Sequence, residues 1–315
     1  MQTRRLLTTA LVVGALGLAG CADTSSSSTA TGDSSAPTTA SKGTVRISGQ
    51  NFTEAEIVAD LYAGVLQNAG YQPQVKLVGT RDVYMATFPK SIDVVPEYTG
   101  GIVDFLIAKD KGANAPVPTT SDPAAAIKEA EPLLKKAGIT LLNPSEANDT
   151  NAFFVTKDYS EQNNVTKLSD LKGKSLALAA APDCQGRVDC EGGLDKTYGI
   201  DITKIIELQF GSQQVFDAVK NGEVQLGETS STDGTVDSQG MVLLEDDQHI
   251  QPAQNLVPAV SSSFLADHPD VADTLNTLMS KLTTEEVSQL NTQVSVNRAK
   301  PEDVAQQWLS DQGLI

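Results

Sequence analysis

The sequence predicts an α/β protein whose sheets are largely parallel and flanked by helices. From residue 43 to residue 315, short apolar stretches of strand type alternate with amphipathic stretches of helical spacing. The chain has 315 residues, which is long enough for two lobes of ordinary size. No internal repeat is found.

The pattern begins with a strand and a helix. Val45 and Ile47 alternate with polar neighbours, as in a half-buried strand. The string Thr53-Glu54-Ala55-Glu56 has the form of a capping box and predicts a helix that ends at Gly70. Further on, the spacing predicts strands at residues 74–78, 92–95 and 139–142 and a helix at residues 124–137.

A second run of elements starts near Asn151. We expect strands at residues 152–156, 175–181, 205–209, 224–226, 241–245 and 256–261, and helices at residues 212–220, 270–282, 284–290 and 301–310. Pro301 lies in the first turn of the last helix with Glu302 and Asp303 behind it, which is favourable chemistry for a helix start.

The N-terminus predicts export and lipidation. Arg4 and Arg5 precede an apolar run over residues 6–19, and Gly20-Cys21 follows. A cysteine at this place resembles the lipobox of bacterial lipoproteins, in which the thiol carries a diacylglycerol. An uncleaved membrane anchor is the alternative, but the run is shorter than the roughly 20 residues that a span needs. We therefore expect a signal peptide at residues 1–20 and an extracytoplasmic protein anchored to the cell membrane by lipid on Cys21.

Residues 21–42 predict a flexible, lipidated tether. They consist almost wholly of Ser, Thr, Ala, Gly and Pro and cannot bury a core. The expected reach of such a tether is roughly 25 Å. The net charge of −17 leaves no basic surface to neutralise phosphates, so we expect no nucleic-acid partner, and lipid has to supply the membrane attachment.

The cysteine count predicts one disulfide. With Cys21 lipidated, Cys184 and Cys190 remain, and an oxidising exterior favours a bond between them. A metal site or a reactive thiol is the alternative. The chain has only two histidines, His249 and His268, and neither is near the pair in sequence, so we expect no metal.

Catalytic signatures are sparse. There is no Gly-x-Ser-x-Gly elbow, and Gly173-Lys174-Ser175 lacks the first glycine of a P-loop because Leu168 stands there. Carboxylates are too numerous for a glycosidase pair to be excluded by counting. Since most acidic residues of an acidic exported protein are solvated, we expect no enzyme, no catalytic residue and no cofactor.

Several strings together resemble the substrate-binding proteins of osmoprotectant ABC importers, the glycine betaine/choline/carnitine group. They occur in the family's order over nearly the whole chain after residue 42, and the ordered set is far more specific than any one string. The strings are Asn51-Phe52-Thr53-Glu54, Ile92-Asp93-Val94-Val95-Pro96-Glu97-Tyr98-Thr99-Gly100, Asn148-Asp149-Thr150, Gly193-Leu194 with Tyr198-Gly199, Thr232-Asp233-Gly234, and Pro301-Glu302-Asp303-Val304-Ala305.

The resemblance implies a two-lobed, type II periplasmic-binding-protein-like fold in which each lobe is a mixed sheet flanked by helices. Two hinge crossings near residues 148–151 and 251–256 would join lobe 1 (43–148 plus 254–315) to lobe 2 (149–253). A small-molecule solute would bind in the cleft, and the lobes would close over it. The implied partners are the permease and the ATPase of an ABC importer, and we expect the receptor itself to be a monomer.

The resemblance also places the ligand contacts. The family holds a quaternary ammonium in a cage of tyrosines, because ring faces attract a methylated cation. Tyr98 is kept, but Asn151, Ser230 and Ala253 stand where the family has tyrosines, and Gln50 replaces a lysine. Arg187 matches the family arginine that grips a ligand carboxylate, although a solvated loop arginine is the alternative. The expected ligand-binding residues are Gln50, Asn51, Phe52, Tyr98, Thr99, Asn151, Arg187, Ser230 and Thr232.

These departures predict a changed ligand. Desolvated cation–π contacts contribute up to about 2 kcal/mol each, so the loss of three corresponds to roughly four powers of ten in affinity. A more polar cleft would suit a neutral, hydroxylated or larger solute. Two alternatives stay open: a quaternary amine in a rearranged cage that uses Tyr84, Phe153 or Tyr198, and a scaffold or adhesion lipoprotein without a ligand.

Overall fold

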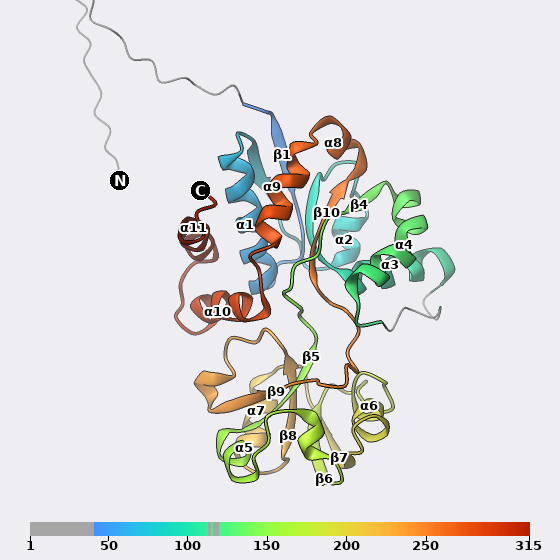
Figure 1. The fold of residues 1–315 in the computed structure, drawn as a ribbon, viewed down its shortest axis with the longest axis vertical. Helices are drawn as coiled ribbons and strands as arrows, with labels where there is room; N and C mark the ends of the chain where they lie inside the picture. The colour runs from blue at the N-terminus through green and yellow to red at the C-terminus, as the bar shows by residue number, and fades with distance from the viewer. Residues whose placement is uncertain (1–40, 113–114, 116–119) are drawn as a thin grey trace, which may run out of the picture. The chain divides into compact units, whose positions relative to one another are not determined.

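The computed structural model describes residues 41–112, 115 and 120–315, which form two five-stranded sheets with their helices (Figure 1). The predicted signal peptide, the lipidation site Cys21 and all but the last residues of the predicted tether lie outside the described residues. Both sheets are mixed and flanked by helices, so the predicted fold class is confirmed.

The first sheet, in lobe 1, has the strand order β2-β1-β3-β10-β4. Strand β1 pairs in parallel with β2 and β3, whereas β10 runs antiparallel to both β3 and β4. The strands are β1 (Thr44–Ile47), β2 (Gln72–Val75), β3 (Val94–Tyr98), β4 (Ile139–Leu141) and β10 (Leu256–Ser261).

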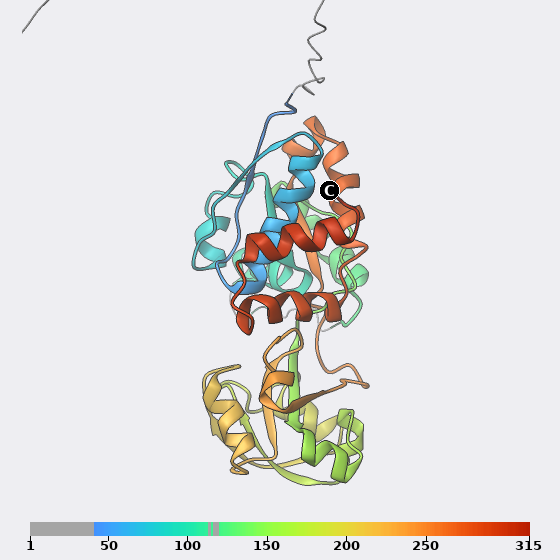
Figure 2. The same cartoon turned by 90° about the vertical axis from the view of Figure 1, so that its left-hand side faces the viewer.

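Helix α1 (Thr53–Asn68) forms the centre of one side of lobe 1. Its apolar face is buried with residues of the C-terminal helices in a single core cluster, and Figure 2 shows the dark-red helices α10 and α11 beside the blue α1. A second cluster joins α2, α3 and α4 to the sheet. The helices are α2 (Arg81–Met85), α3 (Thr99–Lys111), α4 (Pro123–Ala137), α8 (Ser262–Asp267), α9 (Asp270–Met279), α10 (Thr284–Ser295) and α11 (Pro301–Asp311).

The second sheet, in lobe 2, has the strand order β7-β6-β8-β5-β9. Strand β6 is parallel to β7 and β8, and β5 is antiparallel to β8 and β9. The strands are β5 (Asn151–Thr156), β6 (Ser175–Ala180), β7 (Asp201–Glu207), β8 (Leu226–Ser230) and β9 (Met241–Leu244), and the helices are α5 (Lys157–Asn163), α6 (Glu191–Lys196) and α7 (Gln213–Lys220). Two short 3₁₀ turns occupy Leu168–Leu171 and Asp237–Gln239.

The carboxyl ends of the parallel strands meet the segments that pass between the sheets. Tyr98, the last residue of β3, pairs with Leu256, the first residue of β10. In lobe 2, Ser230 ends β8 and pairs with Asn151, which begins β5. Because neighbouring parallel strands end at one edge, the ends of β1, β6 and β7 lie on the same side of their sheets. The lobe boundaries at residues 148/149 and 253/254 stay a prediction.

The predicted capping box is wrong, and α3 is among the helices that were not predicted. The capping box does not form, because Phe52 occupies the N-cap position of α1 without a side-chain hydrogen bond and Thr53 is already helical. Helix α3 was not predicted, since Gly100 and Gly101 weaken its helical pattern. Both glycines have a packing reason: a Cβ at Gly100 would lie 2.7 Å from the Ala253 carbonyl oxygen, and one at Gly101 would lie 2.4 Å from the Arg81 guanidinium.

Candidate ligand site at the strand ends

Lobe 1 presents two stacked rings where β1 and β3 end. The rings of Phe52 and Tyr98 are 6.4 Å apart between centroids, with an angle of 21° between their planes. Phe52 is 41% exposed, so one ring of the pair is open to a binding partner. The Tyr98 hydroxyl donates a hydrogen bond to Glu54 Oε1 at 2.6 Å, which fixes the orientation of its ring. The pair forms an aromatic surface, which the hydrogen bond between the Tyr98 hydroxyl and Glu54 holds in place.

A buried ion pair between Arg81 and Glu97 holds the backbone of Tyr98 in place. Glu97 is 1% exposed, and the Arg81 guanidinium donates to both of its carboxylate oxygens at 2.9 Å. The Tyr84 hydroxyl donates to the same carboxylate, and the Tyr98 backbone N–H donates to Glu97 Oε2 at 3.1 Å. Burial, followed by the charge of Glu97, raises the pKa of Tyr84. The position of Tyr98 therefore depends on a network that lies outside the stacked surface of Phe52 and Tyr98.

Glu54 is a buried carboxyl beside this surface. It is 4% exposed and accepts hydrogen bonds from Tyr98 and from Asn291 Nδ2, the latter at 2.9 Å. Burial and, next, the nearby charge of Asp149 raise its pKa from 4.5 to about 7. Since Asp149 belongs to the first crossing, the titration of Glu54 is linked to the segment that joins the sheets.

The loop after β8 is bonded to α10 of lobe 1. Asn291 Nδ2 also donates to the Thr232 carbonyl oxygen at 3.0 Å, and Thr292 Oγ1 donates to the Gly234 carbonyl oxygen at 2.9 Å. A Cβ at Gly234 would lie 2.4 Å from the Thr292 backbone nitrogen, so only glycine allows this approach. These contacts fasten the strand end that carries Ser230 to the helices of lobe 1.

Asp149 organises the hydroxyl groups at this strand end. The Ser230 hydroxyl donates to Asp149 Oδ1, and Thr232 Oγ1 donates to the same oxygen at 3.0 Å. Burial raises the pKa of Asp149, although these two hydrogen bonds act in the opposite direction. Thr232 is 2% exposed and Ser230 is half-buried. In this structure both hydroxyls are bonded to Asp149 of the first crossing.

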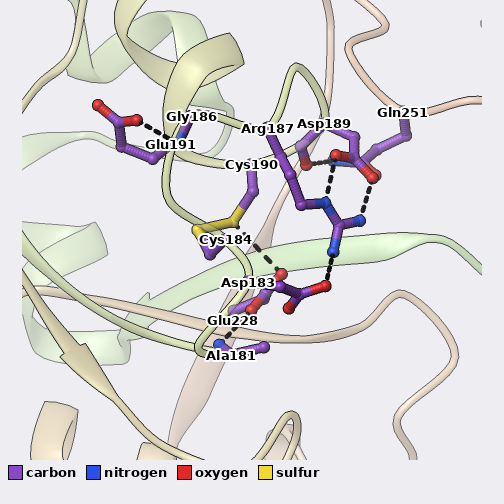
Figure 3. Close-up of a disulfide and its surroundings, with 10 residues drawn as sticks. All are labelled: Ala181, Asp183, Cys184, Gly186, Arg187, Asp189, Cys190, Glu191, Glu228 and Gln251. Atoms are coloured by element: carbon purple, nitrogen blue, oxygen red, sulfur yellow. Dashed lines mark hydrogen bonds and ion pairs between the residues drawn. A yellow bond between two sulfur atoms is a disulfide. The ribbon is translucent and has the colours of Figure 1, made fainter. Parts of the chain in front are cut away.

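The predicted disulfide between Cys184 and Cys190 is confirmed (Figure 3). It closes a loop that presents Arg187. The guanidinium donates through Nε to Asp189 Oδ1 at 2.9 Å, through Nη2 to Asp189 Oδ2, and through Nη1 to Asp183 Oδ2 at 2.8 Å. Each of its three nitrogens is therefore engaged by an aspartate of the same loop.

The remaining predicted contacts lie in different surroundings. Thr99 is fully buried, and its hydroxyl donates to the Ala253 carbonyl oxygen at 3.1 Å. Asn151 lines a pocket of about 310 Å³ at the crossing, together with Asn148 and Thr284. Gln50 is half-buried and Asn51 is exposed, both in the turn between β1 and α1 that leads to Phe52. The structure thus brings together Phe52 with Tyr98 and Ser230 with Thr232, and places Asn151 in a side pocket.

Three residues of this region were missed by sequence reasoning. Glu54 was part of a quoted motif but was assigned only to the helix start, and Asn291 is 237 residues away from it in the chain. Phe210 follows β7 and is 41% exposed. Like Phe52, Phe210 lies between a strand and a helix, and this shared position was the available signal.

The fold and the strand-end surface define a bilobed solute-binding protein of type II. The chain belongs to the family described as OpuAC, the substrate binding domain of ABC-type glycine betaine transport system, whose model matches residues 43–311. The predicted family is thus confirmed. The family is one of binding domains, which agrees with the expectation of a receptor rather than an enzyme.

Curated relatives and solved structures agree with this assignment. The glycine-betaine-binding protein of Pseudomonas aeruginosa is 27% identical over 86% of this chain and 89% of its own length. The carnitine transport binding protein OpuCC of Listeria monocytogenes is 25% identical over 85% and 87%. The apo structure of YehZ from Escherichia coli is 26% identical, superimposes with a TM-score of 0.73, and covers 86% of this chain and 99% of that one. Among the described residues, no helix has the length and apolar composition that a membrane crossing requires.

Proposed function

We propose that this protein is an extracytoplasmic receptor that captures a small molecule between its lobes and delivers it to an ABC importer of the osmoprotectant type. The family match over a two-lobed fold carries this proposal, together with the stacked Phe52 and Tyr98 rings at the strand ends. Lobe 1 would be residues 43–148 plus 254–315 and lobe 2 residues 149–253. Closure about the two crossings would present a liganded form to the permease and its ATPase.

The proposed receptor acts as a monomer at the cell membrane. Residues 1–20 would be removed as a signal peptide, Cys21 would carry the lipid, and residues 21–42 would form the tether. The net charge of −17 argues against a basic membrane-binding face, so the lipid would hold the receptor near its permease.

The proposed ligand is not a simple quaternary amine. Asn151 lines the side pocket, the Ser230 hydroxyl bonds to Asp149, and Ala253 is 2% exposed, so none of the three supplies a ring. The three aromatic side chains that the sequence offers for a rearranged cage, Tyr84, Phe153 and Tyr198, are at most 2% exposed. The Tyr198 hydroxyl donates to Asp246 at 2.5 Å. These contacts argue against the rearranged cage.

Calorimetry with glycine betaine, choline and carnitine tests the changed ligand. We expect no micromolar binding of any of the three, because the energy of the missing rings is of the order of several kcal/mol. Micromolar affinity for one of them would refute the change of ligand while leaving the receptor function intact.

A thermal-shift screen tests the receptor function itself. The screen covers compatible solutes, sugars, polyols, plant phenolics and organic amines, and we expect at least one to stabilise the protein. Tyr98→Ala should weaken the calorimetric affinity for that solute at least tenfold, whereas Tyr98→Phe keeps the ring and should retain most of it. A protein that no solute stabilises would instead fit a scaffold or adhesion role.

A further inference from the structure

Glu228 is a buried carboxyl of lobe 2 that the proposed receptor function does not use. It is 1% exposed and lies on β8, the central strand of the second sheet. Its Oε2 accepts a hydrogen bond from the Ala181 backbone N–H at 2.8 Å. Arg187 pairs with Asp183 and Asp189 instead, and no other Lys or Arg of the described residues forms an ion pair with Glu228. A buried carboxylate without a counter-charge is costly, so its presence here needs a reason.

The second carboxylate oxygen of Glu228 faces the disulfide (Figure 3). Its Oε1 lies 3.4 Å from Cys190 Sγ. A disulfide sulfur has no proton to donate, so within the described part of the chain Oε1 has no hydrogen-bond donor. Reduction would place two thiols, those of Cys184 and Cys190, beside this oxygen. Thiols that lose their protons are strong metal ligands, and a metal ion would supply the missing positive charge.

The three side chains are arranged as donors around one point. Sγ of Cys184, Sγ of Cys190 and a carboxylate oxygen of Glu228 all lie within 4.8 Å of one another, and all three residues are buried. Around a tetrahedral zinc ion, with Zn–S bonds of about 2.3 Å and Zn–O bonds of about 2.0–2.2 Å, neighbouring donor atoms are roughly 3.6–3.8 Å apart. The distance from Oε1 to Cys190 Sγ is already close to this value, so mainly the two sulfurs have to separate.

The loop between the cysteines is free to move outward once the disulfide is broken. Gln185, Gly186 and Val188 are exposed, and Gly186 has a φ of +78°. Glu228 is fixed in a strand with neighbours on both sides, so its carboxylate keeps its place while the loop moves. Residues 183–190 carry two aspartates and one arginine, and this net negative charge favours the approach of a cation.

We propose that reduction of the disulfide converts Cys184, Cys190 and Glu228 into a binding site for a soft divalent metal ion of the zinc class. A dithiol reductant passes two electrons and two protons to the disulfide, becomes a cyclic disulfide itself and leaves two cysteine thiols. The metal ion then displaces one proton from each thiol and binds both thiolates and the Glu228 carboxylate, with water as the fourth ligand. The carboxylate thereby gains the counter-charge that it lacks in the disulfide form.

This site goes beyond the proposed receptor function and does not depend on it. The sequence predicted no metal, because only histidines were considered as partners of the cysteine pair. Glu228 follows Cys190 by 38 residues, and the pairing of β8 with β6 brings it to the disulfide. In an oxidising exterior the disulfide is retained, and the metal site forms where a dithiol reductant is present.

Cobalt binding by the whole protein tests the site. The protein is reduced with dithiothreitol under anaerobic conditions, desalted and titrated with Co²⁺, whose bonds to thiolates give a charge-transfer absorption in the near ultraviolet. We expect the reduced protein to show this absorption and to lose it when Zn²⁺ is added, because Zn²⁺ binds such sites more tightly than Co²⁺. We expect the disulfide form to show no absorption. A reduced protein without the thiolate absorption, or a disulfide form that binds Co²⁺ equally well, would overturn the proposal.

Variants of the three ligands test their roles. Glu228→Gln keeps the shape of the side chain and an oxygen for the Ala181 N–H. It should weaken Co²⁺ binding by more than about tenfold, because the loss of an outer-shell partner alone costs about 10–100-fold. The double variant with Cys184→Ser and Cys190→Ser should lose the absorption altogether. Glu223→Gln is the control at an exposed position shortly before β8 and should bind like the wild type.

Far-ultraviolet circular dichroism establishes that each variant is folded before it is titrated. If Glu228→Gln does not fold, Glu228→Asp takes its place, since it withdraws the carboxylate by one methylene group and should also weaken Co²⁺ binding. Equal Co²⁺ affinity in the wild type and in the folded Glu228 variant would exclude the carboxylate as a ligand and overturn the proposal.

Discussion

Replacing Arg81 by alanine is expected to lower the free energy of unfolding by about 3–5 kcal/mol, because it leaves a buried carboxylate without its counter-charge. Glu97 is 1% exposed, and both of its carboxylate oxygens accept hydrogen bonds from Arg81 at 2.9 Å. Only the Tyr84 hydroxyl and the Tyr98 backbone N–H would remain as side-chain and backbone donors to that carboxylate. Neither donor carries a positive charge that would offset the free-energy cost of burying the Glu97 carboxylate.

Urea denaturation of the two proteins measures this effect. Lys136→Ala is the matched control, since it breaks an ion pair with Asp110 in which the lysine side chain is 73% exposed. Exposed pairs contribute about 0–1 kcal/mol, so the control should unfold close to the wild type. Equal midpoints for Arg81→Ala and Lys136→Ala would show that Glu97 does not depend on Arg81.

The same variant should also weaken ligand binding, since Glu97 bonds to the backbone of Tyr98. If Arg81→Ala is destabilised but still binds its solute with unchanged affinity at low temperature, then Arg81 stabilises the fold without positioning Tyr98 for the ligand. This distinction matters because Tyr98 is the aromatic residue that the family pattern and the structure both place at the strand ends.

Local patterns were sufficient for most elements of the fold. Strand β10 matches the predicted residues 256–261, and α11 starts at Pro301 as its helix-start chemistry predicts. These elements form where their own sequence favours them. Helix α3 is different, because Gly100 is required by the close approach of the second crossing and Gly101 by the Arg81 guanidinium. The hydrogen bond from the Gly101 backbone to Gln254 of that crossing joins residues 153 positions apart. No local pattern contains such a requirement.

The candidate site was predictable only in part, for the same reason. The turn with Phe52 and the end of β3 at Tyr98 follow from strand-helix patterns, but their stacking depends on the order of the strands. The contact between Glu54 and Asn291 depends on how α10 returns to lobe 1. The contacts of Arg187 were not predictable either. Asp183 and Asp189 are its neighbours in sequence, but the sequence alone does not predict that both carboxylates accept hydrogen bonds from its guanidinium.

The stability of the protein should fall between pH 5 and pH 8 through the ionisation of Glu54. Burial and the charge of Asp149 raise its pKa from 4.5 to about 7 in the folded state. For a carboxyl with a raised folded-state pKa, the stabilisation is complete below about pH 4.5 and is lost as the pH rises through about 7. The shift corresponds to a loss of up to about 3 kcal/mol at pH 8. The raised pKa of Asp149 acts in the same direction.

Glu54→Gln should remove this loss, because the amide stays neutral and its oxygen can still accept the hydrogen bond from Tyr98. Its amide nitrogen would face Asn291, whose buried Oδ1 lacks a hydrogen-bond partner and can accept from it after a rotation of the side chain. We therefore expect the variant to be less stable than or equal to the wild type at pH 5 and more stable at pH 8.

Free energies of unfolding at closely spaced pH values test the prediction, with Glu131→Gln as the control that removes the same charge from an exposed position on α4. The informative quantity is the difference between the Glu54→Gln curve and the wild-type curve, after the Glu131→Gln difference is subtracted. A difference that stays constant from pH 5 to pH 8 would mean that Glu54 ionises as an ordinary carboxyl. A difference that grows with pH would establish that folding places a neutral acid next to Tyr98, where the first crossing and α10 meet.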